Sequence, residues 1–200
     1  MRDSNQQDIP CSLSKGEPGS TECSSRVCAS GEKIRILDIL EDTTVDGPGF
    51  RTSIYCAGCQ HHCPGCHNPQ SWDMEGGESV AVSDILKTIL DDPFADVTFS
   101  GGDPMYQAEA FTELARQIKQ QSQKTIWCYT GFTFEQLLLN PKTRALLSYV
   151  DVLVDGRFVQ ELRDEDLLYR GSSNQRLIDV QPSLQEGQVV LWHSPLALVG

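Results

Sequence analysis

The sequence has no long hydrophobic run, and its apolar segments are no longer than a β-strand. A membrane-spanning helix needs about 20 consecutive apolar residues. Residues 1–32 also lack the apolar core of a secretory signal. These absences predict a soluble, cytoplasmic protein with no membrane association.

Basic residues are scarce. The chain has 16 Lys and Arg against 28 Asp and Glu, a formal net charge of -12 and a sequence pI near 4.6. The average surface of such a protein repels a phosphate backbone or an anionic membrane. We therefore expect no nucleic-acid partner.

Aromatic residues are absent from the first 32 positions, which are rich in Ser, Gly, Glu and Gln. Such a segment buries too little apolar surface to offset the entropy of ordering. We predict a disordered extension over residues 1–32 and one catalytic domain over residues 33–200, because the chain is too short for two full domains. Cys11, Cys23 and Cys28 are interpreted as passive thiols, with a second metal site as the alternative.

Four of the eight cysteines lie close together: Cys56 and Cys59 are followed by Cys63 and Cys66. In a reducing compartment this crowding indicates metal binding rather than disulfides. Cys59, Cys63 and Cys66 form a Cys-x3-Cys-x2-Cys run. Three thiolates hold three irons of a cubane cluster and leave the fourth iron open to a substrate.

Two other metal sites use the same cysteines. All four form two Cys-x2-Cys pairs of the kind that binds zinc, although structural zinc modules usually separate their pairs by roughly a dozen residues or more. Only Gln60, His61 and His62 separate them here. The other alternative is a closed four-cysteine electron-carrier cluster, whose usual bacterial spacing has a different order. The spacing alone leaves all three sites open.

Strand patterns alternate with helix patterns after Glu32. Strands are predicted at residues 34–40, 52–55, 96–100, 125–129 and 150–154. The predicted helices are one capped by Ser83 and ended by Asp91-Asp92-Pro93, one with Phe111, Leu114, Ala115 and Ile118 on one face, and one opened by a Thr133 and Gln136 capping box. The alternation predicts a single-domain α/β fold with a parallel sheet that forms a partial (β/α) barrel. Residues 155–179 are predicted as loops, with a short strand at 189–191.

Four glycine-bearing turns lie next to predicted strands. They are Asp46-Gly47-Pro48-Gly49, Ser100-Gly101-Gly102-Asp103-Pro104, Tyr129-Thr130-Gly131 and Asp155-Gly156-Arg157. Each alone is ordinary turn chemistry, with Arg51 expected in solvent beyond the first. Because functional residues gather at the carboxyl ends of parallel strands, we expect these turns and the cysteine loop to share one rim and one site.

The remaining thiols and histidines have simpler interpretations. Cys56 is expected to be a packed thiol at a strand end unless zinc is bound. Cys128 is expected to be a small buried hydrophobic residue within a strand. His61 and His62 are interpreted as exposed loop residues, with metal binding as the alternative, and His193 has no identifiable partner.

Several motifs together resemble a known family. The cysteine run, Cys66-His67-Asn68, Trp72 and the turns at 46–49 and 100–104 resemble the radical S-adenosylmethionine enzymes that activate glycyl-radical enzymes. Later segments resemble the members that act on anaerobic ribonucleoside-triphosphate reductase. These segments are Ile126-Trp127, Tyr129-Thr130-Gly131-Phe132, Val152-Leu153-Val154-Asp155-Gly156-Arg157-Phe158 and Arg170-Gly171-Ser172-Ser173-Asn174-Gln175. The match runs from about Ile34 to Asp179.

The resemblance implies a chemistry. Cys59, Cys63 and Cys66 would hold a [4Fe-4S] cluster, and S-adenosylmethionine would chelate its fourth iron. One-electron reduction would cleave this cofactor, and the resulting 5'-deoxyadenosyl radical would take a hydrogen from a glycine of the reductase. A flavodoxin- or ferredoxin-type protein is the implied electron donor. Because the cofactor supplies the chemistry, no side chain is expected to act as acid or base.

The resemblance also implies where the cofactor binds. The implied contacts are Gly65, Cys66, His67, Gly101, Gly102, Asp103, Thr130 and Asp155. A structural role is the alternative for Thr130 and Asp155. Many relatives have an aromatic residue in place of Gly65, so the adenine contact stays open. Residues 171–175 are expected near the reductase contact or the cofactor pocket.

Two other functions remain alternatives. In the first alternative, the chemistry is the same but the target is pyruvate formate-lyase or another glycyl-radical enzyme. In the second, the chain is a zinc-binding interaction module that uses all four clustered cysteines.

Overall fold

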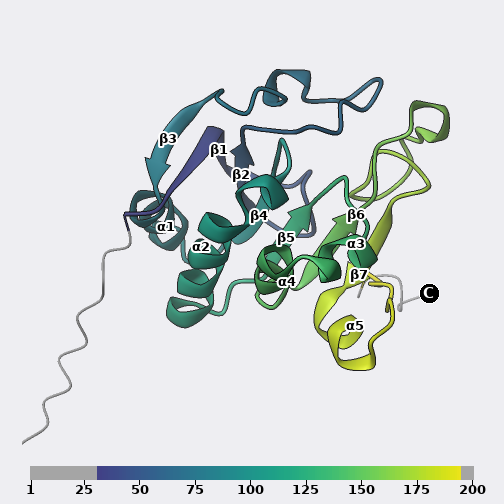
Figure 1. Ribbon diagram of the computed structural model, residues 1–200. Coiled ribbons are helices and arrows are strands. Elements are labelled where there is room, and N and C mark those ends of the chain that lie inside the picture. Colours follow the sequence, from purple (N-terminus) through teal and green to yellow (C-terminus); the bar gives the residue numbers. More distant parts are fainter. Residues whose placement is uncertain (1–30, 195–200) are drawn as a thin grey trace, which may run out of the picture.

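The computed structural model describes residues 31–194, which form one sheet covered by helices (Figure 1). Cys11, Cys23, Cys28 and nearly all of the predicted extension lie outside the described residues. The strands are β1 (Lys33–Thr43), β2 (Arg51–Cys56), β3 (Glu78–Ala81), β4 (Asp96–Gly101), β5 (Ile126–Tyr129), β6 (Val152–Asp155) and β7 (Arg176–Asp179). The α-helices are α1 (Val82–Asp91), α2 (Ala108–Gln121), α3 (Phe134–Leu139), α4 (Pro141–Leu147) and α5 (Val180–Glu186).

The sheet is mixed, with strand order β3-β1-β2-β4-β5-β6-β7. Its centre, β2-β4-β5-β6, is parallel, as the alternating pattern predicts. The prediction of a wholly parallel sheet is wrong at both sides, because β1 runs antiparallel to β2 and β3, and β7 runs antiparallel to β6. Antiparallel neighbours need no helical crossover, and neither the β1–β2 nor the β6–β7 connection contains an α-helix.

Helices α1, α2 and α4 lie along one face of the sheet (Figure 1). The predicted apolar face of α2 is confirmed, since Phe111, Leu114, Ala115 and Ile118 are fully buried. None of the helices within residues 31–194 is long and apolar enough to cross a membrane.

Helix α3 begins as predicted, whereas α1 does not. Thr133 and Gln136 form the complete capping box of α3. Ser83 does not cap α1, which begins one residue earlier. The backbone N–H of Val82 instead donates to Glu32 O at 3.0 Å, which satisfies one of the four free N–H groups at this helix end.

Four elements lie in segments for which we predicted none: β3, α4, α5 and β7. Strand β7 falls inside the predicted loop region 155–179, where its burial depends on pairing with β6 rather than on a pattern of its own. The strand predicted at 189–191 is reduced to one bridge between Leu191 and Ile178.

Arg51 is buried at 0% exposure, which contradicts its predicted place in solvent. Its guanidinium donates to Thr98 Oγ1 and Val97 O, both at 2.6 Å, and lies over the Trp127 ring. A weaker contact reaches Pro48 O at 3.3 Å. Burial lowers the pKa of Arg51 to about 10. The side chain therefore fastens the loop before β2 to the strands beside it.

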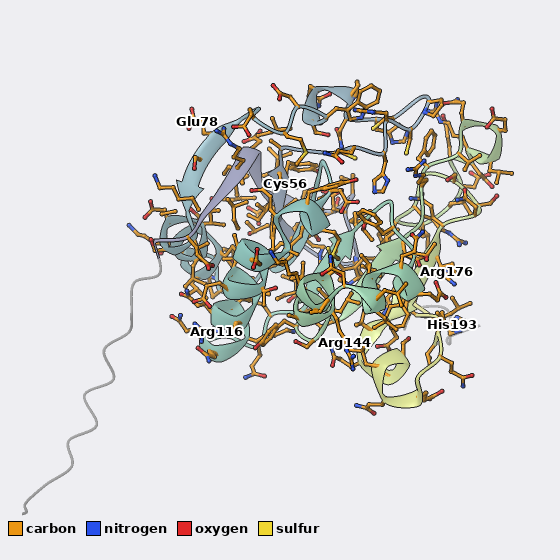
Figure 2. All side chains as sticks on the ribbon, viewed as in Figure 1. Cys56, Glu78, Arg116, Arg144, Arg176 and His193 are labelled. Atoms are coloured by element: carbon orange, nitrogen blue, oxygen red, sulfur yellow. The ribbon has the colours of Figure 1, made fainter. Side chains whose placement is uncertain are left out.

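We expect Arg51→Met to lower the free energy of unfolding of the iron-free protein by about 3 kcal/mol, because buried acceptors would lose their donor. Urea unfolding measures this change. Arg116→Met is the matched control: Arg116 lies on α2 at the surface (Figure 2), where solvent screens its ion pair with Glu113 and the pair contributes little to stability. Equal losses in the two variants would contradict the interpretation.

Candidate functional site

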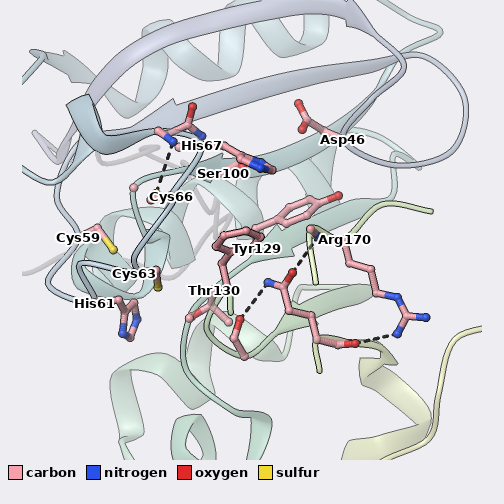
Figure 3. A pocket seen from close by; sticks show the side chains of 18 of the residues that line it. Asp46, Cys59, His61, Cys63, Cys66, His67, Ser100, Tyr129, Thr130 and Arg170 are labelled. Atoms are coloured by element: carbon pink, nitrogen blue, oxygen red, sulfur yellow. Dashed lines mark hydrogen bonds between the residues drawn. The ribbon is translucent and has the colours of Figure 1, made fainter. Parts of the chain in front are cut away.

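A cavity of about 480 Å³ opens at the carboxyl ends of the parallel strands (Figure 3). Cys59, Cys63 and Cys66 line it from one side. The predicted turns also contribute, with Asp46, Ser100, Gly101, Gly102, Tyr129, Thr130, Gly131 and Gly156. The prediction of one shared rim is confirmed for the cysteine loop and the turns after β4, β5 and β6. It is wrong for most of the turn at 46–49, which precedes β2 and of which only Asp46 lines the cavity.

The cysteine loop is tied to the sheet where it leaves β2. Cys56 is paired with Gly101 in the parallel register of β2 and β4. Beyond that pair, the N–H of Gly102 donates to Cys56 O at 2.7 Å, and the N–H of Asp103 donates to Gly58 O at 2.9 Å. A hydrogen bond from Gly58 N to Ser71 O at 2.8 Å joins the start of the cysteine loop to the segment that follows it.

Two glycines permit this close approach of main chains. Gly101 has φ +95°, and a Cβ there would lie 2.5 Å from Cys56 N. A Cβ at Gly102 would lie 2.5 Å from Gly58 O. No other residue fits these positions without displacing the start of the cysteine loop.

The three thiols match in number and type the ligands of a cubane cluster that has one open iron. Each thiolate of a cubane binds a different iron, so the thiols must surround a space rather than converge on one point. Within residues 31–194, no three His, Cys, Asp or Glu side chains are grouped to hold one metal ion. Burial raises the pKa of Cys59 to about 11 and also raises that of Cys63. Metal binding would therefore release protons from these thiols.

Cys56 lies outside the cavity. It is 0% exposed and packs in the main hydrophobic core, within the fold near β2 (Figure 2). Burial raises its thiol pKa well above the usual value. The predicted packed thiol is confirmed, and the four-cysteine zinc site is contradicted. Cys128 is buried in β5, also as predicted.

The predicted cofactor contacts separate into two groups. Cys66, His67, Gly101, Gly102 and Thr130 line the cavity, whereas Gly65, Asp103 and Asp155 do not. A Cβ at Gly65 would lie 1.6 Å from Gln160 Oε1, so the Gln160 side chain fills the space beside it.

Asp103 and Asp155 are buried beneath the rim. Asp155 accepts from Phe134 N at 2.8 Å and from Arg176 Nε at 2.9 Å. Asp103 accepts from Thr130 Oγ1 at 2.9 Å and from backbone and imidazole donors. Since both carboxylates are only 1% exposed, they hold loops in place rather than face the cavity. For Asp155, this agrees with the structural role that was the alternative to a cofactor contact.

The histidines behave differently from one another. His61 is 8% exposed and hydrogen-bonded on both ring nitrogens, so its prediction as an exposed loop residue is wrong. The aromatic rings of Phe132 and Tyr106 cover it. His62 is exposed as predicted and lies against Trp72.

Sequence reasoning missed Tyr55 as a cavity residue. Its hydroxyl is hydrogen-bonded to Asp46, and burial raises its pKa well above the usual value. The sequence carried a signal for its position, because Arg51, Ser53 and Tyr55 alternate along β2 on one face.

Of the segment 171–175, Gly171 and Gln175 line the cavity as expected. Gln175 Nε2 donates to Gly156 O at 3.0 Å and so joins two rim loops.

Comparison with known proteins places the chain in a class. Residues 45–178 match the family model of the 4Fe-4S single cluster domain. This span contains the three cavity cysteines and all four turns. The chain is thus an iron–sulfur protein of the single-cluster kind.

Curated relatives narrow the class. The anaerobic ribonucleoside-triphosphate reductase-activating protein of Vibrio cholerae is 38% identical over 141 residues, which is 66% of this chain and 88% of the relative. The proteins of the same name from Haemophilus influenzae and Enterobacteria phage T4 are 35% and 34% identical, over 66% of this chain and 88% and 86% of theirs. The chain belongs to the family of anaerobic ribonucleoside-triphosphate reductase-activating proteins.

We expect Gly102→Ala to destabilise the iron-free protein by about 2 kcal/mol, because the new Cβ would meet the Gly58 backbone. The start of the cysteine loop would move, and iron bound per chain after anaerobic reconstitution would fall. Gly31→Ala is the control, since a Cβ there would meet no atom within 4 Å. Unchanged iron content in Gly102→Ala would contradict the role of this contact.

Proposed function

We propose that this protein activates anaerobic ribonucleoside-triphosphate reductase by radical S-adenosylmethionine chemistry. One observation carries the proposal: Cys59, Cys63 and Cys66 face one cavity with the glycine turns, while Cys56 is held in the core. Three ligands leave one iron of a cubane available to a small molecule. The cavity volume lies within the usual range for such ligands.

The residues have separate tasks in this proposal. The three cysteines hold the [4Fe-4S] cluster, and Gly101, Gly102 and Thr130 border S-adenosylmethionine. When bound, the two groups supply a reductive cleavage whose 5'-deoxyadenosyl radical takes a hydrogen atom from a glycine of the reductase. The protein positions these groups and excludes competing quenchers.

The remaining parts of the proposal follow from the same chemistry. In this proposal, the parallel centre of the sheet is a partial barrel of the radical S-adenosylmethionine type, within one catalytic domain over residues 33–200. A flavodoxin- or ferredoxin-type protein supplies the electron. A cytoplasmic location keeps the thiols reduced.

We expect Cys63→Ala to lose the cluster and Cys56→Ala to keep it. Anaerobic reconstitution with iron and sulfide should give about four irons per chain for the unchanged protein and for Cys56→Ala, because Cys56 does not reach the cavity. Iron analysis and the visible absorption spectrum measure this difference. Loss of the cluster in Cys56→Ala would contradict the three-ligand site.

The target is tested by radical transfer. Reduced protein, S-adenosylmethionine and the anaerobic reductase should produce a glycyl radical, detected by electron paramagnetic resonance. A parallel reaction contains pyruvate formate-lyase in place of the reductase. A signal on pyruvate formate-lyase alone would overturn the target while leaving the chemistry intact. Absence of S-adenosylmethionine cleavage by the reduced, cluster-loaded protein would overturn the chemistry.

A further inference from the structure

His61 occupies an unusual place for a loop histidine. It lies midway between Cys59 and Cys63, yet its side chain is only 4% exposed. Figure 3 shows the ring next to Cys63 and close to Thr130. A polar ring buried at this point needs partners for both nitrogens.

Both nitrogens have partners, and these determine the tautomer. His61 Nδ1 lies 3.2 Å from Arg157 Nε, which can only donate. Nδ1 is therefore the acceptor, and the ring proton is on Nε2. His61 Nε2 then donates to Asp103 Oδ2 at 2.8 Å.

Asp103 links the ring to two more strands. Its Oδ2 also accepts from Thr130 Oγ1 at 2.9 Å and from Gly131 N at 3.0 Å. Its Oδ1 accepts from Met105 N at 3.0 Å. Asp103 follows β4, the Thr130-Gly131 turn follows β5, and Arg157 follows β6. One imidazole thus connects the cysteine loop to the ends of three parallel strands.

The shape of the site is specific to this ring. His61 makes an edge contact with Phe132 at 4.5 Å between ring centroids. A Cβ at Gly131 would lie 2.4 Å from His61 Cδ2. Gly131 therefore leaves room for the imidazole as well as donating to Asp103.

We propose that His61 is the positioning residue of the cysteine loop, and that its hydrogen bond to Asp103 holds Cys59 and Cys63 toward the cavity. This inference rests on the proposed function only for the identity of the cluster. These hydrogen bonds join protein groups only, so the seating of the loop can be measured in iron-free protein. Residues that orient ligands in this way typically change metal affinity by roughly 10-fold to 100-fold.

Three variants isolate the hydrogen bond. His61→Gln places an amide nitrogen near the position of Nε2 and keeps a donor to Asp103. His61→Asn is one methylene shorter, keeps an acceptor near Arg157 and leaves Asp103 without this donor. His62→Asn is the matched control, because the neighbouring histidine is exposed and lies outside the hydrogen-bond chain.

The first measurement is amide hydrogen exchange of the iron-free protein. In His61→Asn, we expect residues 57–68 to exchange about tenfold faster, the size of one lost hydrogen bond to a charged group. Amides of α1 serve as the internal reference and should be unchanged. His61→Gln and His62→Asn should resemble the unchanged protein. Unaltered exchange in His61→Asn, or equal acceleration in His61→Gln, would overturn the proposal.

The second measurement is the rate at which a chelator removes iron from reconstituted protein. We expect His61→Asn to lose iron about tenfold faster, with His61→Gln restoring most of the retention. Gly131→Ala should reproduce the His61→Asn effect, since the added Cβ would displace the ring. Equal retention in His61→Asn and His62→Asn would overturn the proposal. If the unchanged protein holds no cubane cluster, the proposed function fails, and the exchange measurement alone decides the role of His61.

Discussion

The approach of the β4 turn to the first residues after β2 is the constraint on which the site depends. Hydrogen bonds from Gly102 N to Cys56 O and from Asp103 N to Gly58 O extend the parallel register beyond the last residues of the sheet. This contact determines where the cysteine loop begins. It also turns the Cys56 thiol into the core, while the next three cysteines emerge above the strand ends.

The acidic protein keeps two of its carboxylates beneath the rim rather than inside the cavity. Asp103 and Asp155 each follow or end a parallel strand, and each accepts a backbone N–H from the rim. Arg51 carries the opposite charge and lies at the amino ends of β2 and β4. Its buried guanidinium donates hydrogen bonds there to the carbonyl oxygens of Pro48 and Val97. Buried charge thus fastens loops at both ends of the central strands, where it is fully hydrogen-bonded and stabilising.

The parallel centre of the fold was predictable, because buried strands and one-sided helices carry periodic patterns. The face of α2 and the capping box of α3 followed directly from residue type. Strands β3 and β7 did not, since each is a four-residue segment that is a strand only through its neighbour. Sequence patterns record periodicity within a segment and carry no information about such pairing.

The site was predictable to the level of loops but not of side chains. The turns and cysteines carry spacing signals, so their common rim could be inferred. The burial of His61 could not, because it arises from Asp103 and Arg157, which lie 42 and 96 residues away. The same holds for Asp103, for which the resemblance implied a cofactor contact, whereas hydrogen bonds from the surrounding loops occupy both of its carboxylate oxygens.

The contacts between the cysteine loop and residues 156–175 have a consequence for the order in which the site forms during translation. Gln160 lies against Gly65, Phe158 against His67 and Arg157 against His61. A nascent chain emerges from its amino end, so all three thiols leave the ribosome long before these partners do. The cysteine loop therefore stays incompletely seated until residues 156–175 have been made. Delivery of iron is best matched to a chain that already contains this segment.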